Sequence, residues 1–272
     1  MKAVFIGVVL TILAGPIIAA DTVYPLGAVR TDGVLYVIDR KLPGIWHFAS
    51  SRSAPYFAGS KKFRTPLNAA RCIALDKDGN ILAGDSSTRE IYRFVRGEDP
   101  TPVPLTDGGI GIPMSIAVDD EGTIFVADLE LHRIFKVPHE GGTPEELAAI
   151  SAPRGLAFNS KGELIVVSTT ANQLLRIAKS GEVNIICPGR PFNFPHNVAV
   201  GPDDVMYVTD GYGKCVWKVT PDGEAAKFAT DAAFSNPVGI TMTGDALLVT
   251  DPRANAVFEV TLDGKVNRLT PE

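Results

Sequence analysis

Short apolar runs alternate with polar turns along this chain at a nearly constant spacing. Residues 72–85 (CIALDKDGNILAGD) and 115–128 (SIAVDDEGTIFVAD) show the unit most clearly. Each is typical of two strands joined by a turn that contains glycine. Four further copies cover residues 27–39, 155–168, 197–210 and 239–251. The pattern therefore predicts six copies of one β-rich unit.

The spacing of the copies indicates the architecture. Their last residues are at positions 39, 85, 128, 168, 210 and 251, so successive units are 40 to 46 residues apart. A third β-rich run, such as 133–137, and a weaker fourth, such as 182–186, follow the hairpin. Only 144–150 shows a short apolar period of the helical kind. Four strands at this period predict an all-β fold, a six-bladed β-propeller of four-stranded antiparallel blades, which occupies residues 21–272 as one domain.

The first twenty residues lie outside the repeat. Lys2 precedes an uncharged apolar run, Gly15 and Pro16 interrupt it, and small residues end it at Ala20. This order is typical of a secretory signal peptide. We therefore expect residues 1–20 to be removed by cleavage near Ala20. The mature chain has no second run of membrane-spanning length, so we expect no membrane span in it and a secreted or periplasmic protein.

Charge and cysteine content narrow the partners. The net charge is -5 and the 26 lysines and arginines form no basic cluster, which argues against nucleic acid as a partner. The three cysteines are an odd number for an exported chain. Cys187 and Cys215 fall in neighbouring predicted blades, so a disulfide between them is one alternative. Three free thiols are the other, which the sequence favours.

Several short motifs resemble the NHL repeat. They are Pro153-Arg-Gly-Leu-Ala, Val126-Ala-Asp and His132-Arg-Ile. The resemblance covers about the whole mature chain and implies a six-bladed propeller. NHL propellers serve as enzymes, sensor domains and protein- or RNA-binding platforms, so the resemblance does not imply one function.

An aspartate ends the second strand in five of the six units. These residues are Asp39, Asp85, Asp128, Asp210 and Asp251, and Ser168 holds the position in the sixth unit. A residue type repeated in nearly every blade is better explained by a local role than by a shared cation. We expect these carboxylates to accept hydrogen bonds from backbone N–H groups of the adjacent turns.

Functional residues are expected where the repeats differ. In a propeller the first strand of each blade lines the central channel, so the residue before each first strand borders one mouth. That column reads Leu26, Arg71, Met114, Arg154, His196 and Val238. With the loops on the same face, it makes the candidate ligand-binding residues Arg71, Met114, Arg154, His196, Asn197 and Tyr212. Two guanidinium groups suit a carboxylate or phosphate, unless Arg71 and Arg154 are paired with acidic loop residues instead.

Two enzyme families of this architecture provide a comparison for the mouth. Similarity to the gluconolactonases and regucalcin implies a divalent metal held by an early glutamate and by Asn or Asp side chains. Here the column holds Arg71, Met114 and Arg154, and the first unit has no glutamate. Pro195-His196 and Asp210-Gly-Tyr212 are similar to the peptidylglycine amidating lyases, which implies a zinc held by three histidines. The chain has only His47, His132, His139 and His196, spread over different elements, so we predict no metal site.

The sequence therefore favours a binding protein over an enzyme. We expect an exported NHL-type propeller that binds a small anionic molecule, or a protein or peptide partner, at one face of its channel. The alternative is a lactonase-like hydrolase or amidating-lyase-like enzyme with an atypical, metal-free site that uses His196 and Tyr212 as an acid–base pair. We predict no cofactor and leave zinc or calcium open. Residues 265–269 can complete the last unit, so the sequence leaves two modes of ring closure open: the last unit alone, or a strand borrowed from the N-terminal end.

Overall fold

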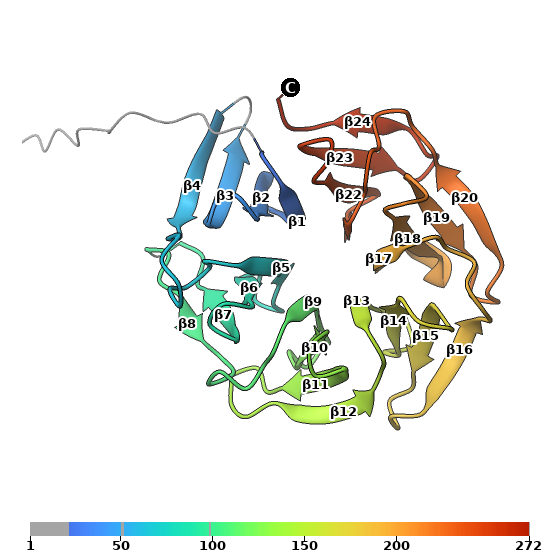
Figure 1. Cartoon of the computed structure of the whole chain (residues 1–272), viewed down its shortest axis with the longest axis horizontal. Helices are drawn as coiled ribbons and strands as arrows, with labels where there is room; N and C mark the ends of the chain where they lie inside the picture. Colours follow the sequence, from blue (N-terminus) through green and yellow to red (C-terminus); the bar gives the residue numbers. More distant parts are fainter. Residues whose placement is uncertain (1–21, 50–51, 98, 272) are drawn as a thin grey trace, which may run out of the picture.

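The computed structural model describes residues 22–49, 52–97 and 99–271, and the expected signal peptide lies outside the described residues. The described chain forms six four-stranded antiparallel sheets arranged as blades around a central axis (Figure 1). The predicted fold class is confirmed. Its only helical segment in the described ranges is one short 3-10 turn, η1 (Pro202–Asp204). These residues contain no helix that is long and apolar enough to cross a membrane.

Each blade takes four consecutive strands, numbered from the axis outward. Blade 1 is β1 (Pro25–Thr31), β2 (Val34–Asp39), β3 (Gly44–Ala49) and β4 (Arg52–Ala58); blade 2 is β5 (Ala70–Leu75), β6 (Ile81–Asp85), β7 (Glu90–Phe94) and β8 (Val103–Pro104); blade 3 is β9 (Pro113–Val118), β10 (Ile124–Asp128), β11 (Arg133–Val137) and β12 (Glu145–Ala149); blade 4 is β13 (Pro153–Phe158), β14 (Leu164–Ser168), β15 (Leu174–Ile177) and β16 (Val183–Cys187); blade 5 is β17 (Pro195–Val200), β18 (Met206–Asp210), β19 (Cys215–Val219) and β20 (Ala225–Ala229); blade 6 is β21 (Gly239–Thr243), β22 (Ala246–Asp251), β23 (Ala256–Thr261) and β24 (Val266–Arg268).

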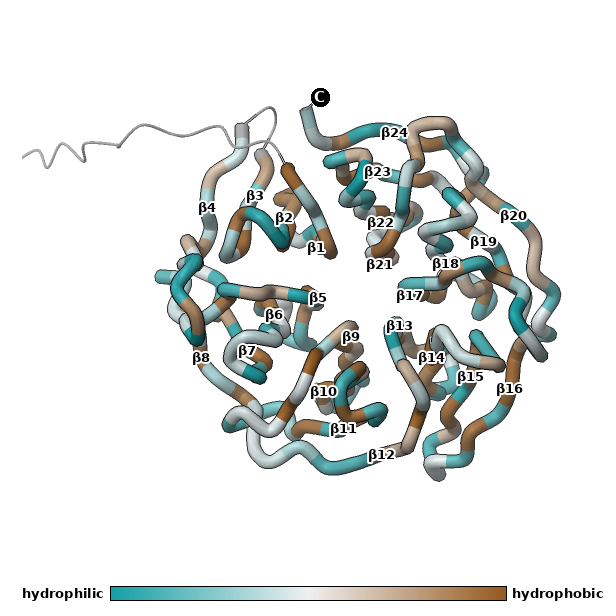
Figure 2. The backbone as a smooth tube through the Cα atoms, viewed as in Figure 1, coloured by the Kyte–Doolittle hydropathy of each residue, from teal (hydrophilic) through white to brown (hydrophobic). Residues whose placement is uncertain are grey.

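The core is divided among the contacts between neighbouring blades. The second strands β6, β10, β14, β18 and β22 are buried along their whole length, because both of their faces pack against other blades. Figure 2 shows hydrophobic residues recurring in every blade at comparable depths. The recurring apolar runs of the sequence are therefore blade interfaces, which explains their continuous rather than alternating pattern.

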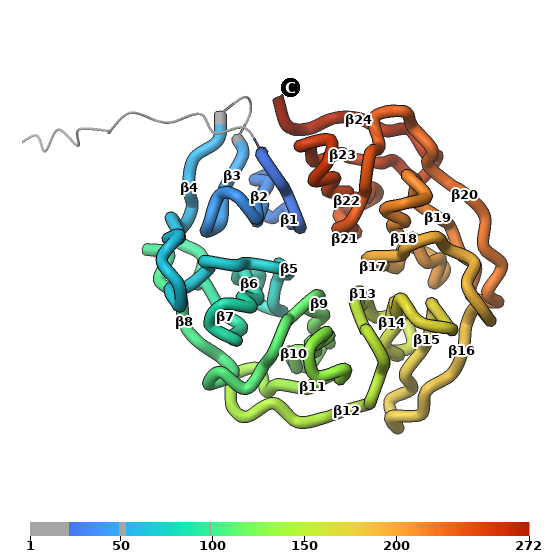
Figure 3. The backbone as a smooth tube through the Cα atoms, in the orientation of Figure 1, coloured from blue at the N-terminus to red at the C-terminus, as the bar shows by residue number. Residues whose placement is uncertain are grey.

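The first and last blades close the ring directly. β1 lies beside β21 and β22, so the two ends of the described chain are neighbours (Figure 3). Val37 and Leu248 belong to one apolar cluster across this joint, and an ion pair joins Arg30 to Glu259 at 2.6 Å. Blade 6 contains only strands from the C-terminal end. The described blades therefore close the ring without a strand borrowed from the N-terminal end, which decides between the two modes that the sequence leaves open.

Two points that the sequence left open are decided by the fold. Residues 144–150, which show a short apolar period of the helical kind, contain the outer strand β12, paired antiparallel with β11. Cys72, Cys187 and Cys215 are all free and buried, so the alternative of a disulfide between Cys187 and Cys215 is wrong. Burial raises the pKa of the Cys72 thiol to about 12, which makes it unreactive.

Candidate functional site

The repeated aspartates are structural, as predicted. Asp128 is fully buried. Its carboxylate accepts hydrogen bonds, at 2.6 to 3.1 Å, from four backbone N–H groups: those of Gly111 and Ile112, before the first strand of the blade, and those of Glu130 and Leu131, in the turn after β10. Each carboxylate thus joins the segment that enters its blade to the turn that follows the second strand. Both oxygens of Asp128 accept from backbone donors, which explains the carboxylate without a shared cation.

The same arrangement recurs in the other blades. Asp39, Asp85, Asp210 and Asp251 each accept backbone hydrogen bonds from both sides. Ser168 replaces them by donating to the carbonyl of Ser151 at 2.8 Å and accepting from the N–H group of Thr170 at 3.1 Å. These bonds hold the start of every inner strand at the same height, and so position the column of residues beside it.

That column surrounds one cavity at the axis, which we call the mouth cavity. Its volume is about 220 Å³. All six residues predicted for the column line it, together with Tyr24, Arg40, Asn197, Asn236, Gly239 and Pro252. Tyr24 and Asn236 were not predicted. Both donate a backbone N–H group to the repeated aspartate of their blade, so their distance from that aspartate could have identified them.

Arg154 lies in the mouth cavity without an acidic partner. Its guanidinium carbon is 4.9 Å from the centre of the Phe194 ring, and its buried Nε atom has no hydrogen-bond partner. Burial lowers the pKa of Arg154, against an opposing effect of Tyr212. A half-buried guanidinium with an unused donor has the chemistry that suits an anion.

Arg71 faces the same space from the second blade. Its Nε atom donates to Oγ of Ser86 at 3.0 Å, which leaves the terminal guanidinium nitrogens for a ligand. Burial lowers the pKa of Arg71 and the nearby charge of Arg40 lowers it further, while the carboxylate of Asp85, which is beyond ion-pair distance, opposes the shift. The ion pairs found among the described residues include none with Arg40, Arg71 or Arg154. The alternative of Arg71 and Arg154 pairing with acidic loop residues is therefore wrong.

Phe194 connects the remaining candidates, and sequence reasoning missed it. The ring of His196 meets Phe194 edge-on at 5.0 Å, and the ring of Tyr212 stacks on it at 4.9 Å. Tyr212 is 63% exposed, so it belongs to the rim of the mouth rather than to the cavity. His196 and Tyr212 both contact Phe194, but no hydrogen bond joins the two residues. Phe194 directly precedes Pro195, and none of the other five units has a phenylalanine at this position. That difference between the repeats could have identified it.

His196 is neutral at neutral pH. Burial, reinforced by the charge of Arg154, lowers its pKa to about 4, while Asp210 opposes the shift. A neutral imidazole adds no charge to the mouth, and it offers one nitrogen as an acceptor and the other as a donor.

This shift predicts a pH-dependent stability. The unfolded chain binds a proton at the ordinary pKa of 6.5, whereas the folded chain does so only near 4. The free energy of unfolding should therefore hold above pH 6.5 and fall by up to roughly 3 kcal/mol between pH 6.5 and 4. Urea unfolding across this range checks it. In His196→Gln this component should vanish; wild-type and variant curves that stay parallel would contradict the assignment.

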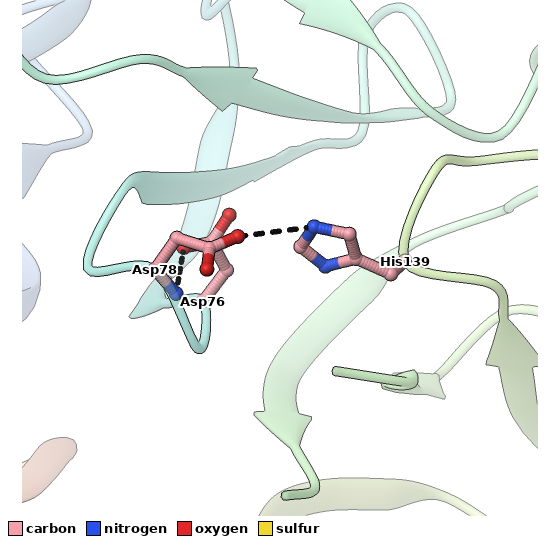
Figure 4. A group of neighbouring side chains, drawn as sticks. All are labelled: Asp76, Asp78 and His139. Carbon is pink, nitrogen blue, oxygen red and sulfur yellow. Dashed lines mark hydrogen bonds and ion pairs between the residues drawn. The ribbon is translucent and has the colours of Figure 1, made fainter. Parts of the chain in front are cut away.

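The other three histidines do not line the mouth cavity. His47 contacts Tyr36 edge-on in blade 1, and Nδ1 of His132 accepts the N–H group of Ala152 at 3.0 Å. His139 lies with Asp76 and Asp78 on the opposite face, where one potential metal-ligating atom of each lies within 4.8 Å of the others (Figure 4).

Arg93 already supplies the positive charge in that cluster. Its Nε atom is 2.8 Å from Oδ2 of Asp76, and its terminal nitrogen donates to the carbonyl of His139 at 2.6 Å. Nε2 of His139 is 3.1 Å from Oδ2 of Asp78. The group is a network of charged and polar contacts that ties blade 2 to blade 3, and Arg93 supplies its positive charge.

The chain is similar to several known proteins. Residues 61–270 match the model of the virginiamycin B lyase family. A virginiamycin B lyase of Nocardia farcinica is 25% identical over 194 residues, which are 71% of this chain and 67% of that protein. Peptidyl-glycine alpha-amidating monooxygenase B of Xenopus laevis is 24% identical over 220 residues, or 70% of this chain. The chain spans only 25% of the length of that Xenopus relative.

Solved structures show the same fold. A virginiamycin B lyase from Staphylococcus aureus superposes with a TM-score of 0.69 at 18% identity, covering 92% of this chain and 85% of that one. A gluconolactonase from Xanthomonas campestris superposes with a TM-score of 0.73 at 14% identity, covering 92% and 87%. The resemblance to propellers of the NHL, gluconolactonase and amidating lyase kind is confirmed at the level of architecture.

Proposed function

The chain belongs to the virginiamycin B lyase family, and on that premise we propose that the mouth cavity binds a small organic anion. One observation carries the proposal: Arg40, Arg71 and Arg154 line a cavity of about 220 Å³ without an acidic partner among the described residues. Burying unpaired cations is unfavourable, and a bound anion would relieve that cost through charge-assisted hydrogen bonds. The pattern of residues 1–20 places this activity in an exported protein.

The surrounding groups favour a carboxylate attached to a compact organic body. The terminal nitrogens of Arg71 and the free Nε of Arg154 are the charged donors. Neutral His196 and the ring of Phe194 offer a polar and an apolar contact beside them. The carboxylate of a peptide end has the same chemistry, so a protein partner would bind through its terminus.

Binding of simple carboxylates tests the proposal directly. Acetate and succinate should raise the melting temperature of the mature protein at constant ionic strength, because a ligand at a hundred times its Kd stabilises the folded state by about 2.7 kcal/mol. Acetamide, which has the same shape as acetate and no charge, should leave the melting temperature unchanged. If acetate, succinate and inorganic phosphate all produce neither a shift nor heat in calorimetry, the mouth is not an anion site.

A lyase activity is the second candidate, favoured by the lyase that names the family and by a neutral imidazole beside two guanidinium groups. In an elimination, His196 would accept the proton next to a carbonyl group, and Arg71 or Arg154 would stabilise the negative charge on its oxygen. The electron pair of the broken C–H bond would form the double bond, and the leaving group would depart with its own pair. A base whose pKa is about 4 is weak, which ranks this function second.

Mass spectrometry and ultraviolet absorbance after incubation with virginiamycin B test the second candidate. A ring-opened product of unchanged mass with a new conjugated double bond supports it. His196→Gln should abolish this product while acetate binding persists. A product formed equally by the variant would exclude His196 as the base.

A further inference from the structure

The repeat sets equivalent residues in rings along the channel. One step beyond the mouth, the ring is Gly27, Cys72, Ser115, Gly155, Asn197 and Gly239, which we call the waist. Three steps further, the ring is Arg30, Leu75, Val118, Phe158, Val200 and Met242, which we call the far ring. The mouth column holds two arginines and a histidine beside three apolar residues, whereas five of the six far-ring residues are apolar.

A second cavity occupies the channel beyond the waist. Its volume is about 370 Å³, and all six far-ring residues line it. Apolar residues such as Ile116, Leu156 and Ile240 form much of its remaining wall. Asn197 lines this cavity and the mouth cavity, so the two meet at that side chain. The channel therefore changes from cationic to apolar along its length.

The waist carries few bulky side chains. A Cβ atom at Gly155 would lie 2.6 Å from Oδ1 of Asn197, and one at Gly239 would lie 2.5 Å from the carbonyl of Leu26, so close packing of the blades requires glycine at both positions. Asn197 is the largest waist residue, and its Oδ1 is held by the N–H group of Val198 at 2.8 Å.

The one charged residue of the far ring is not available to a ligand. Arg30 is paired with Glu259 at 2.6 Å. Leu75, Val118, Phe158, Val200 and Met242 are all only partly buried, which leaves apolar surface facing the channel. Covering apolar surface releases about 25 cal/mol per Å², so an apolar ligand segment would be stabilised there.

Resting on the proposed anion site, we propose that the ligand is an amphiphilic carboxylate: its head binds between Arg71 and Arg154, and its slender apolar tail passes Asn197 into the channel. The mouth and far rings are four residues apart along each inner strand, which corresponds to roughly 13 Å at the rise of an extended chain. A medium-chain alkyl group is the class of tail that fits. A branched or bulky tail would meet Asn197.

Three methionines report on this path in the unaltered protein. Met114 lines the mouth cavity, Met242 belongs to the far ring, and Met206 is buried inside blade 5 as an internal control. With ¹³C-methyl-methionine labelling, acetate should shift the signal of Met114 alone. n-Octanoate below its micelle concentration should shift Met114 and Met242, and leave Met206 in place. Affinity should rise roughly fourfold per methylene from butanoate to octanoate.

Three other results would contradict the inference, and they distinguish failure of tail entry from failure of the anion site. If octanoate binds no more tightly than acetate and Met242 stays in place, the tail does not enter, although the anion site stands. If 1-octanol, or octanoate on the double variant Arg71→Gln/Arg154→Gln, shifts Met242 equally, apolar entry is independent of the mouth and the inference fails. If no carboxylate of any length binds, the proposed function fails as well.

A channel-filling variant gives a second test. Thr241 on β21 lines the channel, and Thr243 lies two residues further along the same strand outside it. In Thr241→Phe, octanoate should bind no more tightly than acetate, so the gain in affinity from the alkyl chain is lost. Acetate should bind as in wild type, which also reports correct folding. Thr243→Phe is the matched control and should keep the gain. Loss of the gain in Tyr212→Ser but not in Thr241→Phe would place the tail on the rim and overturn the inference.

Discussion

Replacing both Arg71 and Arg154 with glutamine is expected to weaken acetate and octanoate binding by at least roughly a hundredfold, because each hydrogen bond to a charged group contributes about 1.5–3 kcal/mol. Both side chains line the mouth cavity without an acidic partner. The same double variant should be as stable as wild type or more stable without ligand, since it removes two half-buried unpaired charges. Calorimetric titration and urea unfolding measure the two effects.

Arg253→Gln is the matched control for this experiment. Arg253 is exposed on a loop of the same face, next to Asp251, and does not line the mouth cavity. It should bind acetate like wild type, which separates a specific site from the general charge of the face. A double variant that loses stability and keeps its affinity would show that the arginines are structural.

Asp128→Ala is expected to lower the free energy of unfolding by roughly 3–5 kcal/mol, because four backbone N–H groups lose their acceptor in a buried site. Chemical denaturation monitored by circular dichroism gives the value. Asp128→Asn should lose less, since the amide oxygen still accepts hydrogen bonds. Asp120→Ala removes an exposed aspartate from the turn of the same blade and should change stability by less than about 0.5 kcal/mol. Equal effects of the two alanine substitutions would contradict the structural role.

The repeated residues were predictable because their surroundings repeat with them. Every blade imposes the same contacts on the aspartate and on the apolar strands, so position in the unit determines what Asp210 or Ile124 does. Position in the unit also placed Arg71, Met114, Arg154 and His196 around one mouth. By contrast, the pattern of 144–150 is local and weak, and pairing with β11 decided it.

The sequence by itself thus determined the number of blades and the level at which the mouth residues lie, because these depend on periodicity within one chain. Only the tertiary structure decided that Arg71 and Arg154 have no carboxylate, that Phe194 joins Arg154, His196 and Tyr212, and that the channel becomes apolar beyond Asn197. Such properties depend on distances and burial between different blades, and no spacing along the chain encodes them.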